Sequence, residues 1–122
     1  MKKKWITILI TSVVFYGCYY DVEQQLYGIS GPCDISNVTF SSSITSVLQN
    51  YGCLGCHSGV SASGGIRLDS YSYVKTMAIN GKLYGSINYN SGYSPMPKGS
   101  NKMLSCDINK VKAWINSGSP NN

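Results

Sequence analysis

The sequence predicts a loop-rich, all-α fold of three to four short helices in one small domain. Three observations favour this fold class. Apolar residues recur at helical spacing in three separate segments, no alternating apolar run is long enough for a convincing strand, and 13 of the 122 residues are glycine. A chain of this length has room for a single domain with one modest core.

The N-terminal residues have the features of an export signal. Three lysines at positions 2–4 precede an apolar stretch over residues 5–16, which would rise only about 18 Å as a helix and could not cross a bilayer core of roughly 30 Å. Residues 15–18, Phe-Tyr-Gly-Cys, resemble a bacterial lipobox. We therefore expect residues 1–17 to be a lipoprotein signal peptide and Cys18 to be lipidated, which would anchor an exported protein in the cell envelope, in the periplasm or at the outer membrane. Ordinary cleavage before an unmodified Cys18 is the alternative.

The basic charge of the chain is concentrated at its start. The formal net charge is +5, from ten basic and five acidic residues. Without the segment that precedes Cys18, seven basic and five acidic residues remain, so the net charge is 7 − 5 = +2. Such a weakly charged chain has no nucleic-acid-binding footprint, and we expect no nucleic acid as a partner. Residues 18–32 have no sustained periodicity, so we expect a lipid anchor and tether there and a folded domain over residues 33–122.

The first predicted helix covers residues 37–51. Its apolar residues recur at i, i+3, i+4 and i+7 and form one stripe, which consists of Ile44, Val47, Leu48 and Tyr51. The serines at 41–43 are candidate N-caps, and Gly52 is a typical helix end.

Two more helices are predicted further along the chain. One runs over about residues 70–80 and ends at Gly81, with an apolar face of Tyr73, Val74 and Met77. The segment 82–103 is rich in Gly, Asn, Ser, Tyr and Pro, so we expect mostly ordered loop. The last helix covers about residues 106–117 and ends at Gly118, with Ser105 as its N-cap and a stripe of Ile108, Val111 and Ile115.

Residues 53–57 read Cys-Leu-Gly-Cys-His, which matches the C-x-x-C-H pattern of covalent haem attachment. Two cysteines on one helical turn can each form a thioether with a vinyl group on the same porphyrin edge, and the next histidine can then bind the iron. We expect Cys53 and Cys56 to hold one haem c, with His57, the single histidine of the chain, as an axial ligand. A thioredoxin-like motif would need a βαβ context, and a Cys₃His zinc site would leave one other cysteine unused.

The five cysteines can all be assigned a use. Lipidation takes Cys18, and haem attachment takes Cys53 and Cys56. This leaves Cys33 and Cys106, which we expect to form a disulfide in an oxidising compartment. The closed loop of about 70 residues corresponds to roughly 4 kcal/mol in the chain-entropy treatment, a large contribution for a small domain.

A second axial ligand has to come from a methionine, and three candidates remain after cleavage of the leader. Met77 lies on the apolar face of a predicted helix, where methionine usually packs in a core. Met96 lies between Pro95 and Pro97, which restrict the backbone on both sides and present its side chain rigidly. Met96 is therefore the favoured ligand, Met103 is the next candidate, and a vacant or otherwise filled site is the third possibility.

Residues 33–122 resemble the short monohaem cytochromes c found in bacterial envelope lipoproteins. Four elements occur in the same order as in that family: a helix before the 53–57 pentad, Gly-Gly-Ile-Arg-Leu-Asp at 64–69, Met-Pro at 96–97, and Leu-Ser at 104–105 followed by Ala-Trp-Ile at 113–115. The resemblance implies a small class I-like cytochrome c fold in which the first and last helices cross and one haem lies between them. It implies axial ligation by His57 and Met96.

The same resemblance suggests roles for two further residues. Trp114 would pack near the haem from the last helix, although plain core filling is an equally good interpretation. Arg67 would contact a haem propionate, although an exposed surface arginine is the commoner case.

The expected function is single-electron transfer to and from redox partner proteins. The chain would then be an electron carrier without a small-molecule substrate, and no acid–base pair or nucleophile accompanies the motif. Two alternatives belong to other classes. A haem-based sensor or peroxidase-like module would have a labile methionine ligand and would respond to carbon monoxide or peroxide. A lipid-anchored structural or zinc-binding module would be colourless.

Overall fold

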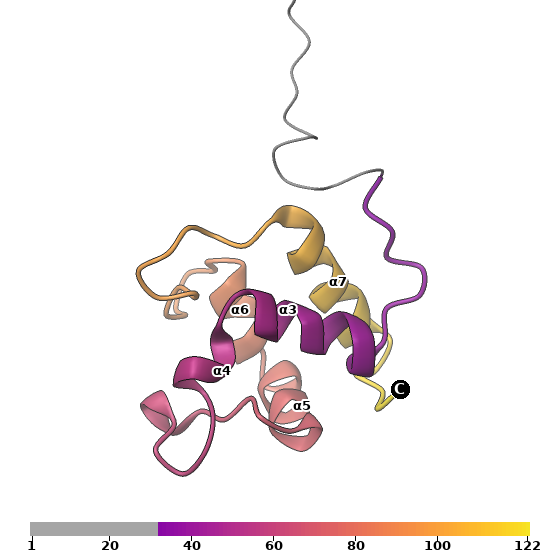
Figure 1. The fold of residues 1–122 in the computed structure, drawn as a ribbon. Helices are drawn as coiled ribbons and strands as arrows, with labels where there is room; N and C mark the ends of the chain where they lie inside the picture. The colour runs from indigo at the N-terminus through magenta and orange to yellow at the C-terminus, as the bar shows by residue number, and fades with distance from the viewer. Residues whose placement is uncertain (1–31) are drawn as a thin grey trace, which may run out of the picture. The chain divides into compact units, whose positions relative to one another are not determined.

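The computed structural model describes residues 32–122, and the unit formed by Cys33–Asn122 is all-α (Figure 1). None of residues 32–122 lies in a strand, as the sequence predicts. No helix in this part of the chain is long and apolar enough to span a membrane. The predicted signal peptide, the lipidated Cys18 and all but the last residue of the predicted tether lie outside the described residues.

The first helical segment begins at Phe40, three residues later than predicted. A π-helical turn, η2 (Phe40–Ile44), continues directly into α3 (Thr45–Asn50). The predicted serine caps are wrong, because the hydroxyl of Thr39 accepts a hydrogen bond from the Ser42 amide at 3.3 Å. Gly52 ends the segment as predicted, with φ of 65°, a left-handed conformation that glycine adopts readily.

The second predicted helix is present as α5 (Tyr71–Ile79), with Ser70 as its N-cap residue. Its predicted apolar face is only partly right. Val74 and Ala78 are buried and Met77 packs on the core, but Tyr73 is 40% exposed. The short turns α4 (Cys53–Cys56) and η3 (Ser63–Gly65) precede α5.

The helix α6 (Lys82–Ile87) lies in the segment predicted as loop, so this part of the prediction is wrong. Leu83 and Ile87 are one turn apart, and both are buried in the core. Gly85 lies between them, and the aromatic ring of Tyr93 packs directly on it. A Cβ atom at position 85 would be only 2.5 Å from Cδ2 of that ring. The glycine that weakens the helix signal in the sequence is therefore what lets the following loop fold onto α6.

We expect Gly85→Ala to destabilise the domain by about 1–3 kcal/mol, the usual cost of overpacking. The new methyl group would overlap the Tyr93 ring and displace it with its loop. Urea unfolding followed by circular dichroism measures the change. Gly55→Ala is the matched control, because a Cβ there meets nothing within 4 Å and alanine favours a helical turn. Equal unfolding midpoints for the two variants would contradict this packing.

The last helix, α7 (Ser105–Asn116), buries Ile108, Val111 and Trp114. Trp114 takes the core position predicted for Ile115, which is only half-buried. Ser105 is not the N-cap as predicted, because the helix begins at that residue and Leu104 is the cap. Gly118 ends the helix as predicted, and the amides of Gly118 and Ser119 donate to the carbonyls of Ile115 and Trp114 in a Schellman motif.

The C-terminal residues pack back onto the start of the first helical segment. The side-chain oxygen of Asn122 accepts a hydrogen bond from the Phe40 amide at 2.8 Å, and its main-chain oxygen accepts one from the Ser41 amide at 2.8 Å. The indole nitrogen of Trp114 donates to the Pro120 carbonyl at 2.9 Å. The first two bonds satisfy amides at the start of η2, and the third satisfies the buried indole nitrogen. All three acceptors lie within residues 120–122.

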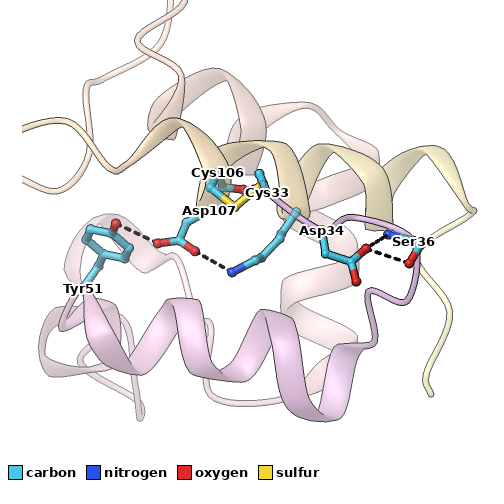
Figure 2. The surroundings of a disulfide bond; sticks show 7 residues. Cys33, Asp34, Ser36, Tyr51, Cys106 and Asp107 are labelled. Carbon is cyan, nitrogen blue, oxygen red and sulfur yellow. Dashed lines mark hydrogen bonds and ion pairs between the residues drawn. A yellow bond between two sulfur atoms is a disulfide. The ribbon is translucent and has the colours of Figure 1, made fainter. Parts of the chain in front are cut away.

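The predicted disulfide between Cys33 and Cys106 is present (Figure 2). Its Cα atoms are 5.5 Å apart, and it joins the segment before η2 to the first turn of α7. Beside it, the hydroxyl of Tyr51 donates to Asp107 at 2.9 Å and accepts from the Leu104 amide at 3.0 Å. Burial raises the pKa of the Tyr51 phenol, so it stays a donor at neutral pH. The segment before η2 is thus linked covalently to α7, and Tyr51, at the end of the first helical segment, is linked to α7 and the residue before it by hydrogen bonds.

Candidate haem site

Cys53 and Cys56 lie at the two ends of the single turn α4. Both thiols are free, and the other two cysteines among residues 32–122 are tied in the disulfide. Cys53 is half-buried and packs against the core, whereas Cys56 is exposed. Burial raises the pKa of the Cys53 thiol. The structure therefore brings two unpaired thiols together on one turn, as the sequence predicts.

His57 follows this turn directly and is only 9% exposed. Its Nδ1 atom is 3.0 Å from the carbonyl oxygen of Ile66. Because a carbonyl can only accept, Nδ1 carries the proton, and a neutral ring then has its lone pair on Nε2. No hydrogen bond within residues 32–122 involves Nε2. In this part of the chain the ring thus has one nitrogen fixed by a hydrogen bond and the other without a partner, as a metal-ligating histidine requires.

The loop that follows His57, residues 58–69, folds back onto the histidine and is held there by a main-chain hydrogen bond. The Leu68 amide donates to the His57 carbonyl at 2.7 Å. Next to this bond, the Gly59 amide donates to a carboxylate oxygen of Asp69 at 2.8 Å. Together with the bond between Ile66 and Nδ1, these contacts fix the histidine at its main chain and its ring.

Arg67 lies in this loop and pairs with Asp69. Its Nε and one terminal nitrogen donate to the two carboxylate oxygens at 3.1 and 2.8 Å, and the other terminal nitrogen donates to Tyr73 at 3.0 Å. The hydrogen bond from Arg67 and then the Gly59 amide lower the pKa of Asp69 to about 2, so the pair persists from neutral pH down to that range. The predicted contact between Arg67 and a propionate stays a prediction, because the structure gives this guanidinium partners within the domain.

Trp114 is fully buried among the core residues, and its ring centroid lies 5.7 Å from that of Phe40. Its indole nitrogen already has an acceptor in Pro120. The core-filling interpretation of this residue is therefore correct. Its predicted contact with a haem stays a prediction.

The three candidate methionines lie in different environments. Met103 is 4% exposed and belongs to the core, and Met77 packs against that core. Met96 is half-buried and lies in the loop between α6 and α7. That loop is held by the Met96 amide, which donates to the Ser86 carbonyl at 3.1 Å, and by Tyr93 packed on Gly85. In the view of Figure 1 this loop and α4 lie on the same side of the domain. Of the three thioethers, that of Met96 is the one presented by an anchored loop outside the core.

No protein-family model, curated protein or solved structure matches this chain. The site is therefore interpreted from its own residues. Within residues 32–122, no three His, Cys, Asp or Glu side chains are placed to hold a metal ion together, and the disulfide removes the thiols that a Cys₃His zinc site would need. The same part of the chain has no strands for a thioredoxin-like motif.

Sequence reasoning missed two contributors to the site. The Ile66 carbonyl has no side-chain signal, because any residue supplies the same main-chain acceptor. Asp69 belongs to the family-like segment 64–69, but no motif gives it a role, and its bond to Gly59 joins residues ten apart in the sequence. Both contacts depend on how the 57–69 loop folds back onto His57, which the sequence does not show.

Proposed function

We propose that residues 33–122 form an exported monohaem c-type cytochrome that transfers single electrons. Cys53 and Cys56 would hold the haem covalently, and His57 and Met96 would be the axial ligands. The observation that supports this most is a turn with two free thiols, followed by a histidine whose Nδ1 is hydrogen-bonded and whose Nε2 has no hydrogen bond within residues 32–122. A haem bound there would supply reversible one-electron exchange at its iron.

The residues of the chain suit electron transfer better than substrate chemistry. His57 is held at its ring and main chain, and the loop of Met96 is anchored on α6, so each candidate ligand is presented by a segment that is fixed locally. A haem held by both His57 and Met96 would leave no place at its iron for a substrate. A thioether ligand favours the ferrous state and raises the reduction potential relative to a second histidine.

The proposed setting is the cell envelope, with redox proteins as partners and a lipid anchor at Cys18. The disulfide between Cys33 and Cys106 supports an oxidising compartment, since such bonds are rare in the cytosol. Lys98 and Lys102 are exposed in the segment around Met96. They would attract an acidic partner toward this side of the domain.

The test is to express the protein in cells with a haem-attachment system and to record its mass and reduced spectrum under denaturing conditions. We expect the mass of the chain plus one haem and a c-type spectrum that survives denaturation. The Cys53→Ala/Cys56→Ala variant, which keeps the disulfide, should lose both. Added carbon monoxide should leave the native ferrous spectrum unchanged; a changed spectrum would favour a sensor or peroxidase-like module. A colourless protein, alongside a control cytochrome matured in the same cells, would overturn the proposal.

A further inference from the structure

The loop that carries the Ile66 carbonyl is held by side chains that the proposed ligand set does not use. Ile66 itself offers only a main-chain oxygen to His57. The next residue, Arg67, is fixed by two bonds to Asp69, and Asp69 in turn binds the Gly59 amide, two residues beyond the histidine. The Arg67–Asp69 pair thus connects the start of the 57–69 loop, at Gly59, with its end, next to Ile66.

We propose that Arg67 and Asp69 are positioning residues that hold the Ile66 carbonyl against Nδ1 of His57 and so set the orientation and basicity of the imidazole. This inference rests on the proposed haem ligation by His57. It gives Arg67 a role different from contact with a propionate, and it assigns a role to Asp69 where the motif alone gives none.

The physical argument follows the main chain. Arg67 also donates to the Tyr73 hydroxyl, and its guanidinium carbon lies 4.3 Å from the Tyr73 ring centre, so the pair is fixed to α5. In Asp69→Asn one acceptor oxygen is replaced by an amide nitrogen, so Arg67 loses at least one of its two bonds to residue 69 together with the charge attraction. The main-chain bond from Leu68 to His57 still holds the loop, but the carbonyl of Ile66, directly before Arg67, loses its side-chain support and can move away from Nδ1. Hydrogen bonds to the second nitrogen of a ligating histidine are what fix its ring and raise its basicity.

The expected change in reduction potential has a definite sign. A more basic imidazole stabilises ferric iron, so a weaker bond between Nδ1 and Ile66 should raise the potential. The loss of charge alone would shift the reduction potential in opposite directions for the two residues. Removing the negative Asp69 would also raise the potential, but removing the positive Arg67 would lower it. A rise in both variants therefore reports the lost orientation of His57.

The experiment uses the full haem-loaded protein with Arg67→Gln or Asp69→Asn. Two quantities are measured in each variant, the midpoint potential and, by NMR of the diamagnetic ferrous form, the exchange rate of the Nδ1 proton of His57. Asp34→Asn is the matched control. Asp34 is also an exposed carboxylate with two hydrogen bonds, but both go to its neighbour Ser36.

We expect the Nδ1 proton to exchange about fivefold faster or more in both variants, the effect of losing one ordinary hydrogen bond, and both potentials to rise. The Asp34→Asn protein should keep the wild-type exchange rate. An unchanged exchange rate, or potentials that shift in opposite directions for Arg67→Gln and Asp69→Asn, would overturn the positioning role while the cytochrome proposal stands. A colourless wild-type protein would instead overturn both. The mass of each variant with its haem, and its unfolding midpoint, show that the substituted proteins are matured and folded.

Discussion

Met96→Ala is expected to lower the midpoint potential of the haem-loaded protein by on the order of 0.1 V, since axial ligands tune haem potentials over about 0.8 V. The reason is the loss of the thioether, which favours ferrous iron. The sulfur–iron charge-transfer band of the ferric protein should disappear, and carbon monoxide should bind the ferrous form. Because Met96 is half-buried and outside the core, its truncation should leave no cavity in the core. Redox titration and visible spectra measure these effects.

Met103→Ala is the matched control, and its expected effects are the reverse. Met103 is 4% exposed within the core, so its truncation should lower the free energy of unfolding by about 2–5 kcal/mol. The charge-transfer band and the potential should stay near the wild-type values. If the band were lost in Met103→Ala and kept in Met96→Ala, Met103 would be the ligand and the proposed ligand pair would be wrong.

The second large effect is expected at the disulfide. Cys33→Ser/Cys106→Ser should lower the free energy of unfolding by about 4 kcal/mol in the chain-entropy treatment. The two residues are 73 positions apart, so the bond removes many open conformations from the unfolded chain. Such a loss is a large share of the roughly 5–15 kcal/mol that stabilises a typical domain. Guanidinium unfolding of the wild-type and variant proteins measures the difference.

A reductant provides the control for this prediction. With the haem kept ferrous in every sample, it should shift the unfolding midpoint of the wild-type protein toward that of the variant and leave the variant unchanged. The Cys53→Ala/Cys56→Ala protein keeps the disulfide, so it should respond to reductant as the wild type does. A wild-type midpoint that does not respond would show that the bond contributes little to stability.

The sequence predicts helices best where periodicity and end signals agree. The helices α5 and α7 fall within one residue of their expected bounds, because each has an apolar stripe and a glycine just beyond its end. The helix α6 was missed because Gly85 interrupts it, and the need for that glycine comes from Tyr93, a residue of the next loop. Tertiary packing, which local propensity does not contain, decides this element.

Errors of one or two positions have similar physical causes. Four hydroxyl residues, at 39 and 41–43, have comparable capping ability. Thr39 is the cap in the structure, where the next residue, Phe40, donates its amide to Asn122, more than eighty residues away. Trp114 and Ile115 are neighbours on α7, so a small change in helix phase decides which one enters the core.

The candidate site was predictable to the extent that it is local. Cys53, Cys56 and His57 are consecutive parts of one motif, and the structure keeps them on one turn and its end. The partner of Nδ1 is a main-chain oxygen nine residues away, and the partners of Arg67 come from its own loop and from α5. These contacts depend on how the 57–69 loop folds, and side-chain chemistry alone does not determine that.

The contacts of Asn122 with Phe40 and Ser41 have a consequence for the order in which the domain can form. During synthesis the first helical segment emerges about eighty residues before the acceptors of these two amides. The indole of Trp114 likewise obtains its acceptor only once Pro120 is present. These donors therefore reach their native acceptors only when residues 120–122 are present. The two ends of residues 33–122 thus close on each other late, which favours cooperative folding of the domain over stepwise assembly.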